Sequence, residues 1–266
     1  MDILQKIKDH KVSEVAQRRS DTPLDALKDS PHYSASTFSL TQALRTPGAT
    51  GVISEFKKKS PSEGFINQNA CVKEVTTGYI QAGASALSVL TDEHFFGGTS
   101  EDLQMARKHN RCPILRKDFI IDEYQIHETK SMGADVILLI AEILTADQVE
   151  NFSALARSLG LEVLLEIHSE EQLDKYTPSV NVIGVNNRNL KNFKVDIQHS
   201  IDLFDRLPED SVKISESGIS QVSDMVRLAD AGYEGFLIGT QFMKTADPVN
   251  ACRTMLEEYK NQQKPI

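Results

Sequence analysis

Short apolar runs that end on a polar or charged residue recur along the chain. Each run has the length of a buried strand, and helix-like segments separate them. Parallel strands that are buried on both faces appear in a sequence as near-continuous apolar stretches. The pattern therefore predicts an α/β fold, a (β/α)₈ TIM barrel, with its active site at the carboxyl ends of the strands. The eight runs are Gly51–Lys57, Ala86–Asp92, Pro113–Asp118, Val136–Ile140, Val163–Glu166, Val182–Asn186, Val212–Gly218 and Gly235–Thr240.

The segments between these runs carry helix start and stop signals. Thr145–Gln148 and Ser169–Gln172 both fit a capping box, in which a hydroxyl and a Gln amide satisfy backbone groups at a helix start. They predict helices directly after the fourth and fifth strands. Gly160 is expected to end the first of these helices, because glycine readily takes the left-handed conformation.

The first 45 residues precede the first strand and differ from the rest. A length of 266 residues suits one barrel of roughly 250 residues plus an extension. We therefore expect a single barrel domain over residues 1–266, with residues 1–45 as a helical extension. This extension either packs on the outside or bottom of the barrel or covers the catalytic mouth. An amphipathic helix is predicted from the spacing of Ile3, Leu4, Ile7, Val12 and Val15.

Composition and charge narrow the possible partners. The chain is 40% hydrophobic and 25% charged, as is typical of soluble globular proteins. A net charge of −9 argues against nucleic-acid binding, so an anionic ligand requires a local group of cations and backbone N–H groups. The charged start does not fit a signal peptide, and the apolar runs are too short to span a membrane. Cys71, Cys112 and Cys252 have no metal-ligand spacing and are interpreted as core residues, which suits a cytoplasmic location.

Side-chain direction groups the polar residues at the strand ends. Residues i and i+2 of a strand point to the same side, so Glu55 and Lys57 both face the barrel mouth. One isolated charge at a strand end is usually only a solvated side chain. Five strands that end in this way indicate a common site. The same rule directs Lys117, Glu166, Asn186 and Arg188 toward the mouth.

The last two strands end on small residues and hydroxyls. Glu216, Ser217 and Gly218 follow the seventh strand, and Gly239 and Thr240 follow the eighth. Barrels often bind phosphate at this place through backbone N–H groups, and glycine permits a close approach of the backbone. Each glycine alone is equally compatible with a tight turn. Together they predict a phosphorylated metabolite as ligand.

These residues resemble a known family. The segment Ile53–Gly64, ISEFKKKSPSEG, closely resembles the first-strand signature of the indole-3-glycerol-phosphate synthases of tryptophan biosynthesis. The resemblance covers essentially the whole chain, including the helical extension that this family carries. It departs at Lys59, where Ala is common, and at the pair Thr240–Gln241. It continues through Ser88–Asp92, Phe95–Gly98, Leu115–Ile120, Leu164–Ile167, Gly184–Leu190, Ser215–Ile219 and Leu237–Gly239.

The resemblance implies a lyase that closes an indole ring with loss of CO₂ and water. Its substrate is 1-(2-carboxyphenylamino)-1-deoxyribulose 5-phosphate, it requires no metal or organic cofactor, and it is a monomer. The resemblance assigns Lys117 as the general acid and Glu166 as a second acid or base, while Glu55 orients the ammonium. A free lysine has a pKa of about 10.4. We therefore expect burial and the neighbouring Lys57 to lower the pKa of Lys117.

The remaining roles concern substrate binding. Phe96 and Phe119 either flank the aromatic ring or belong to the core, and His168 is interpreted as a bystander. Lys57, Ser60 and Arg188 would hold the anionic ends, Asn186 and Glu216 the hydroxyl chain, and Ser217, Gly218, Gly239 and Thr240 the phosphate.

Two alternatives differ in chemistry. A Schiff-base aldolase also uses an inward lysine and a phosphate site in a barrel. A catalytically inactive subunit that only binds a phosphorylated metabolite needs no acid–base residues. The combination of Glu55, Lys117 and Glu166 argues against that inactive subunit.

Overall fold

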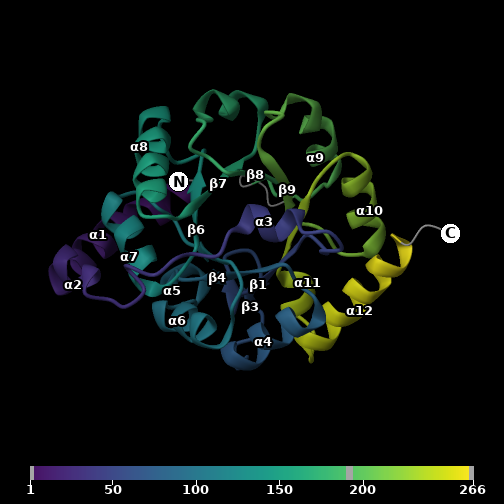
Figure 1. Ribbon diagram of the computed structural model, residues 1–266, viewed down its shortest axis with the longest axis horizontal. Coiled ribbons are helices and arrows are strands. Elements are labelled where there is room, and N and C mark those ends of the chain that lie inside the picture. The colour runs from purple at the N-terminus through teal and green to yellow at the C-terminus, as the bar shows by residue number, and fades with distance from the viewer. Residues whose placement is uncertain (1–2, 190–193, 264–266) are drawn as a thin grey trace.

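The structure, a computed structural model, describes residues 3–189 and 194–263. Within these residues eight parallel strands close a barrel in the order β1-β10-β9-β8-β7-β6-β5-β4, which confirms the predicted fold (Figure 1). The last residue quoted from the family motif after β8, Leu190, lies outside the described residues. The barrel strands are β1 (Val52–Phe56), β4 (Ala86–Leu90), β5 (Ile114–Lys117), β6 (Val136–Ile140), β7 (Glu162–Ile167), β8 (Val182–Asn186), β9 (Val212–Glu216) and β10 (Gly235–Ile238).

Helices surround the barrel, and a two-stranded antiparallel sheet, β2 (Lys59–Ser60) and β3 (Gly64–Phe65), follows β1. The helices between and after the strands are α4 (Val72–Ala82), α5 (Glu93–Phe96), α6 (Ser100–His109), α7 (Glu123–Met132), α8 (Ala146–Ser158), η1 (Glu170–Lys175), α9 (Gln198–Leu203), η2 (Phe204–Arg206), α10 (Val222–Asp230), α11 (Thr240–Met243) and α12 (Pro248–Gln262). Among the described helices, none is long and apolar enough to cross a membrane.

One of the two expected capping boxes is present. Thr145 and Gln148 cap α8 reciprocally, and Gly160 follows that helix with a φ of 76°. The prediction at Ser169 is wrong, because a 3₁₀-helix follows β7 and the Ser169 side chain makes no cap hydrogen bond. The amide oxygen of Gln172 accepts instead from the backbone N–H of His168 (2.7 Å). The Gln172 side chain, which would complete the capping box at Ser169, therefore binds the backbone of His168 instead.

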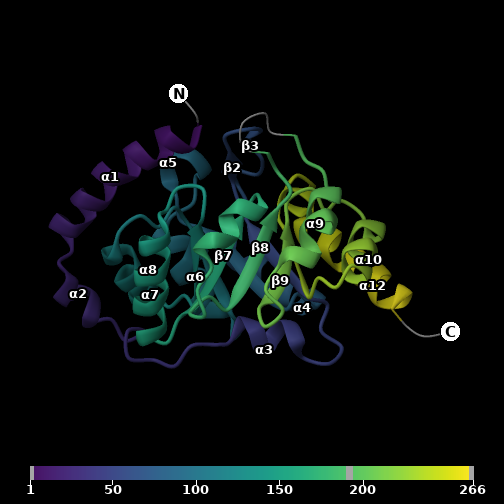
Figure 2. The same ribbon diagram turned by 90° about the horizontal axis from the view of Figure 1, so that it is seen from above.

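The N-terminal extension covers both ends of the barrel. It contains α1 (Ile3–Asp21), α2 (Leu24–Lys28) and α3 (Leu40–Arg45). Thr41 N–H donates to Glu162 at the start of β7 (3.0 Å), and Arg45 pairs with Glu234 just before β10. Figure 2 shows α3 at this end of the barrel, whereas α1 lies with β2 and β3 at the opposite end. Of the two placements considered for the extension, α3 takes the one at the bottom of the barrel and α1 takes the one at the mouth (Figure 2).

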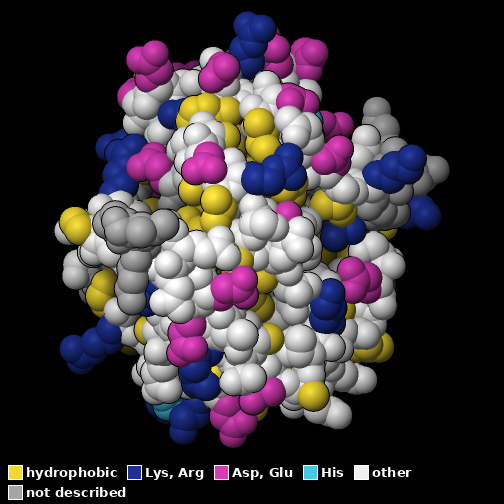
Figure 3. Space-filling model, turned by 90° about the vertical axis from the view of Figure 1, so that its right-hand side faces the viewer, with side chains coloured by type: hydrophobic (Ala, Val, Ile, Leu, Met, Phe, Trp, Pro, Cys, Tyr) yellow, Lys and Arg dark blue, Asp and Glu magenta, His cyan; other side chains and the backbone are white. Residues whose placement is uncertain are grey.

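The interior is mainly apolar, but it also contains buried polar and charged side chains such as Lys11, Arg116 and Glu166. The side chains of Cys112 and Cys252 are buried as expected, but the prediction that Cys71 is a core residue is wrong, since it is exposed just before α4. On the face that Figure 3 presents, basic and acidic side chains are interspersed with apolar ones. Mixed charge of this kind is typical of a solvated surface.

Candidate active site

All the residues selected from the sequence line one pocket at the carboxyl ends of the strands. This pocket has a volume of about 320 Å³. Strand register explains the convergence, because parallel strands end at the same edge of a closed barrel. The residues brought together are Glu55, Lys57, Ser60, Phe96, Lys117, Phe119, Glu166, Asn186, Arg188, Glu216, Ser217, Gly218, Gly239 and Thr240.

Lys117 lies at the centre of an ion-pair cluster. Its Nζ donates to Glu166 Oε2 (2.7 Å), at the end of β7, and to Glu216 Oε2 (3.0 Å), at the end of β9. Its side chain is only 15% exposed, and those of the two carboxylates are less exposed still. A buried lysine paired in this way is held in one position, with its remaining donor capacity available for a ligand.

The electrostatics of Lys117 contradict the expected pKa shift. Burial alone would lower the pKa of this ammonium, but the attraction of Glu166, Glu216 and Glu55 outweighs burial and raises it above its ordinary value. Lys57 is not among the largest influences on this pKa. The expectation that burial and Lys57 lower the pKa of Lys117 is therefore wrong, because three carboxylates attract the charged form of the lysine.

The two carboxylates bound to Lys117 have opposite pKa shifts. Burial would raise the pKa of Glu166, but Lys117, His168 and a hydrogen bond with Asn186 lower it to about 2. For Glu216, burial and repulsion by Glu166 and Glu55 exceed the attraction of Lys117 and raise the pKa to about 7. Like charges that share one cation titrate at separate pH values. Glu166 is thus ionised near neutrality, whereas Glu216 exchanges a proton there.

His168 is closer to the site than its interpretation as a bystander implied. Its Nε2 lies 3.8 Å from Glu166 Oε1, and its side chain is 13% exposed. Burial lowers the pKa of His168, so the ring is mainly neutral near pH 7. His168 is therefore a neighbour of Glu166, but His168 itself does not line the pocket.

Glu55 and Lys57 form a second ion pair in the same pocket. Lys57 Nζ lies 2.8 Å from Glu55 Oε1, and this pair follows from their common direction at the end of β1. Gly239 leaves room for it, because a Cβ atom at that position would lie 2.4 Å from Glu55 Oε1. The glycine expected to approach a phosphate thus also makes space for a carboxylate.

Two phenylalanines form an aromatic wall of the pocket. The ring centroids of Phe96, on α5, and Phe119, after β5, are 5.9 Å apart with an interplanar angle of 38°. On the loop after β1, Ser60 Oγ accepts from the N–H of Glu63 (3.2 Å). An aromatic ligand ring can pack against the two phenylalanines while this loop borders the pocket.

A side-chain hydrogen bond from Asn187 joins the loop after β8 to the loop after β9. Ser217 has a φ of 69° and Gly218 one of 77°, and successive left-handed residues direct backbone N–H groups to one side. Asn187 Nδ2 donates to Ser217 O (3.0 Å) and to Ser215 Oγ (2.9 Å). A serine with positive φ is strained, and Asn187 holds it there.

Several residues of this site had no clear signal in the sequence. Lys244, at the end of α11, adds a cation to the pocket, and Gly184 faces Glu216 at a place where a Cβ atom would lie 2.1 Å from Glu216 Oε1. Lys244 follows no strand end, and Gly184 belongs to the quoted motif Gly184–Leu190 but was given no role there. From α1, the apolar residues Ile3, Leu4 and Ile7 also line the pocket.

Comparisons with known structures agree with the fold. A 3-hexulose-6-phosphate synthase from Salmonella typhimurium matches with a TM-score of 0.63 and 12% identity, over 80% of this chain and 100% of that one. A chain of the tryptophan synthase a2b2 complex from Pyrococcus furiosus matches with a TM-score of 0.58 and 15% identity, over 80% of this chain and 98% of that one. At such low identity these structures show a common barrel fold alone.

Sequence relatives are much closer. An indole-3-glycerol phosphate synthase from Bacteroides thetaiotaomicron is 44% identical over 256 residues, which are 96% of this chain and 98% of that protein. One from Variovorax paradoxus is 40% identical over 264 residues, 96% of this chain and 99% of that protein. The family model "Indole-3-glycerol phosphate synthase" matches residues 4–255. The barrel, the convergence of the motif residues in one pocket and these matches together show that the chain belongs to the indole-3-glycerol phosphate synthase family.

Proposed function

We propose that the pocket converts 1-(2-carboxyphenylamino)-1-deoxyribulose 5-phosphate to indole-3-glycerol phosphate, CO₂ and water. The chain is an indole-3-glycerol phosphate synthase, a carboxy-lyase of tryptophan biosynthesis. The observation that supports its use of this pocket is the contact of Lys117 with both Glu166 and Glu216. One proton donor and two carboxylates of different pKa meet beside a wall of two phenylalanines.

Ring closure needs an acid at the ketone oxygen. As the arene carbon bonds to the ketone carbon, the C=O π electrons move to oxygen, and Lys117 Nζ supplies the proton. The raised pKa of Lys117 keeps it protonated at neutral pH, so the donor form is fully populated. Loss of CO₂ from the ring carbon then returns an electron pair to the ring system. Positioned proton transfer contributes about 10²–10⁴-fold to such a reaction.

Dehydration needs a base at the former sugar methylene and an acid at the leaving hydroxyl. The pKa of Glu166 is lowered, so this carboxylate is ionised and suited to accept the methylene proton. After Lys117 has regained a proton from solvent, it donates this proton to the hydroxyl, which leaves as water and completes the indole. Glu55 contributes by attracting and orienting the ammonium of Lys117.

The other residues bind the substrate at its two ends. We assign the aromatic ring to Phe96 and Phe119, and the hydroxyl chain to Asn186 and Glu216. Because the pKa of Glu216 is raised to about 7, its carboxyl group can take up a proton near neutrality and can then donate a hydrogen bond to a hydroxyl as well as accept one. Lys57, Ser60 and Arg188 are assigned to the anionic groups, and Ser217, Gly218, Gly239 and Thr240 to the phosphate.

The proposed enzyme differs from a Schiff-base aldolase in the state of its lysine. An amine must lose its proton before it attacks a carbonyl carbon, and the carboxylates around Lys117 stabilise the charged form. We further propose that the enzyme acts as one catalytic domain, as a monomer and in the cytoplasm. The exposed thiol of Cys71 suits that reducing compartment.

The function is tested by the rise of indole fluorescence with purified protein and the carboxyphenylamino-deoxyribulose phosphate. Lys117→Ala is expected to lower kcat by at least about 10² with little change in substrate Kd, because the proton is transferred only in the transition state. Lys108→Ala, at an exposed position on α6, is the control and keeps the activity. Absence of indole product from the parent protein would contradict the proposed function. Activity of Lys117→Ala within a few-fold of the parent would reject Lys117 as the acid.

A further inference from the structure

Lys11 is a fully buried lysine on α1, outside the group of residues that line the pocket. Its side chain is 0% exposed, and it lies on the same helix face as Leu4 and Ile7. A lysine is almost never fully buried without a partner, because desolvation of an unpaired ammonium is costly. Its partners are therefore the key to its role.

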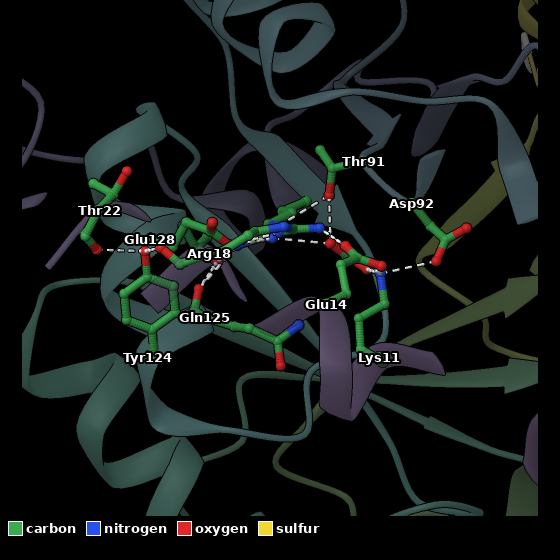
Figure 4. A network of polar contacts seen from close by, with 12 residues as sticks. Lys11, Glu14, Arg18, Thr22, Thr91, Asp92, Tyr124, Gln125 and Glu128 are labelled. Carbon is green, nitrogen blue, oxygen red and sulfur yellow. Dashed lines mark hydrogen bonds and ion pairs between the residues drawn. The ribbon is translucent and has the colours of Figure 1, made fainter. Parts of the chain in front are cut away.

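Two buried aspartates hold the ammonium of Lys11. Nζ lies 2.8 Å from Asp92 Oδ2 and 3.0 Å from Asp118 Oδ1, and both carboxylates are 0% exposed. Figure 4 shows Lys11 and Glu14 extending from α1 toward Asp92. Asp92 follows β4 and Asp118 follows β5, so one side chain of the extension joins the ends of two barrel strands.

Each of these aspartates also holds the backbone of one pocket phenylalanine. Asp92 Oδ1 accepts from the N–H groups of Phe95 (2.7 Å) and Phe96 (3.3 Å) and so caps α5. Asp118 Oδ1 accepts from the N–H of Phe119 (2.8 Å). The chain of contacts from Phe96 through Asp92, Lys11 and Asp118 to Phe119 is continuous.

The same helix is fastened by further contacts. Arg18 contacts Glu14 and pairs with Glu128 (3.0 Å), and all three residues are labelled in Figure 4. Glu128 in turn binds Arg116 (2.6 Å), whose guanidinium also reaches Asp118. Asp118 therefore has a second cationic partner, Arg116, besides Lys11. Asp92, by contrast, forms its ion pair with Lys11 among the described residues.

We propose that Lys11 is a positioning residue that sets the spacing of Phe96 and Phe119 and thereby the seat of the substrate's aromatic ring. This inference rests on the proposed function of the two phenylalanines. Lys11 acts through Asp92 and Asp118 and does not touch the substrate. Loss of its ammonium leaves the two aspartates to repel each other, which separates the two backbone segments that they hold.

The test compares Lys11→Met with Lys6→Met, an exposed lysine on the same helix that loses the same charge. Two ligands report on opposite ends of the pocket: 2-(methylamino)benzoate for the aromatic end and inorganic phosphate for the other. We expect Lys11→Met to weaken 2-(methylamino)benzoate binding and to raise substrate KM by about tenfold, with phosphate affinity unchanged. Lys6→Met leaves all three quantities within twofold of the parent. A role of Lys11 in overall stability alone would not produce this split.

Direct binding of 2-(methylamino)benzoate needs no turnover, so the result does not depend on the proposed reaction. A parent protein that binds the probe but forms no indole product contradicts the function and leaves the positioning test intact. If Lys11→Met does not fold, Lys11→Gln replaces it, because its amide can still donate a hydrogen bond to one of the two aspartates while the positive charge between them is lost. A folded variant whose two affinities are unchanged, or fall equally, overturns the proposal.

Discussion

Gly184 leaves the space that Glu216 occupies at the barrel mouth. A Cβ atom on Gly184 would lie 2.1 Å from Glu216 Oε1 and 3.1 Å from Leu164 Cδ1. Real atoms do not approach that closely, so any side chain at this position displaces the carboxylate. The position of the Glu216 carboxylate therefore depends on the absence of a side chain at Gly184.

Gly184→Ala is therefore expected to lower kcat by about 10² or raise KM comparably, since small misplacements of catalytic groups have effects of this size. The matched control is Gly160→Ala. Gly160 has a φ of 76° and lies far from Glu216, so alanine there costs about 1–2 kcal/mol of stability without affecting the pocket. Steady-state kinetics and thermal unfolding of both variants distinguish the two effects. Equal activities of the two variants would show that Glu216 tolerates displacement.

The strands were predictable because their signal is local. Each barrel strand is buried on both faces, so its apolar run is continuous in the sequence and its polar residue marks the carboxyl end. Convergence of those ends then follows from closure of the barrel. Many of the site residues from Glu55 to Thr240 could be collected in this way without any knowledge of their distances, whereas Ser60, Phe96 and Phe119 were assigned through the family resemblance.

Which side chains of α1 are buried could not be predicted from the local sequence pattern alone. Val12 was expected in the apolar stripe but is 58% exposed, while Lys11 beside it is fully buried. Helical periodicity assigns charged residues to the solvent face. Burial of Lys11 depends on Asp92 and Asp118, which come from distant strands, and the sequence around Lys11 contains no sign of them.

The charge state of the site depends on the balance of charges in space. The sequence indicated that Lys57 and Lys117 enter one pocket, but Lys57 is paired with Glu55 and Lys117 with Glu166 and Glu216. The sign of a pKa shift depends on which partner is nearest. That information requires the positions of atoms far apart in the chain.

Glu55→Gln tests how these carboxylates interact. Glu55 repels the ionised form of Glu216 and contributes to the rise of its pKa to about 7. Removal of that negative charge stabilises ionised Glu216, so its transition is expected to move to lower pH. The shift is measured by NMR titration of the side-chain carboxyl carbons at fixed ionic strength. Glu63→Gln is the control, because Glu63 lines the pocket but is not among the charges that shift Glu216. A transition that stays in place or rises would contradict this coupling.

Thr240→Glu tests the assigned phosphate end. Gly239→Asp would reach Glu55 as well as a phosphate, so Thr240, its neighbour in the pocket, gives the cleaner test. A carboxylate there repels the anionic ligand, and we expect substrate KM and the inhibition constant of inorganic phosphate to rise together by about tenfold or more. Gln262→Glu on α12 adds the same charge at an exposed site and serves as control. Unchanged phosphate inhibition in a folded Thr240→Glu would place the phosphate elsewhere.

Lys57→Met separates substrate binding from proton transfer. The lysine is assigned to an anionic group of the substrate, and methionine keeps much of its length without the charge, so KM is expected to rise by about tenfold. Glu55, released from its partner, would only raise the pKa of Lys117 further. Because the carboxylates already hold that pKa above about 10.4, the ordinary value for lysine, the basic limb of kcat/KM is expected not to move in the neutral range.

The measurement for Lys57→Met is a pair of pH–rate profiles at fixed ionic strength, with substrate saturation checked at each pH. Lys59→Met is the matched control, since Lys59 lies in the same loop, carries the same charge and does not line the pocket. A basic limb that lies in the neutral range and moves to higher pH in Lys57→Met alone would mean that Lys57 holds the pKa of Lys117 near neutrality, against the effect of the surrounding carboxylates. An unchanged KM would instead remove Lys57 from the substrate-binding residues. A raised KM with an unmoved limb is the result that the two separate ion pairs predict.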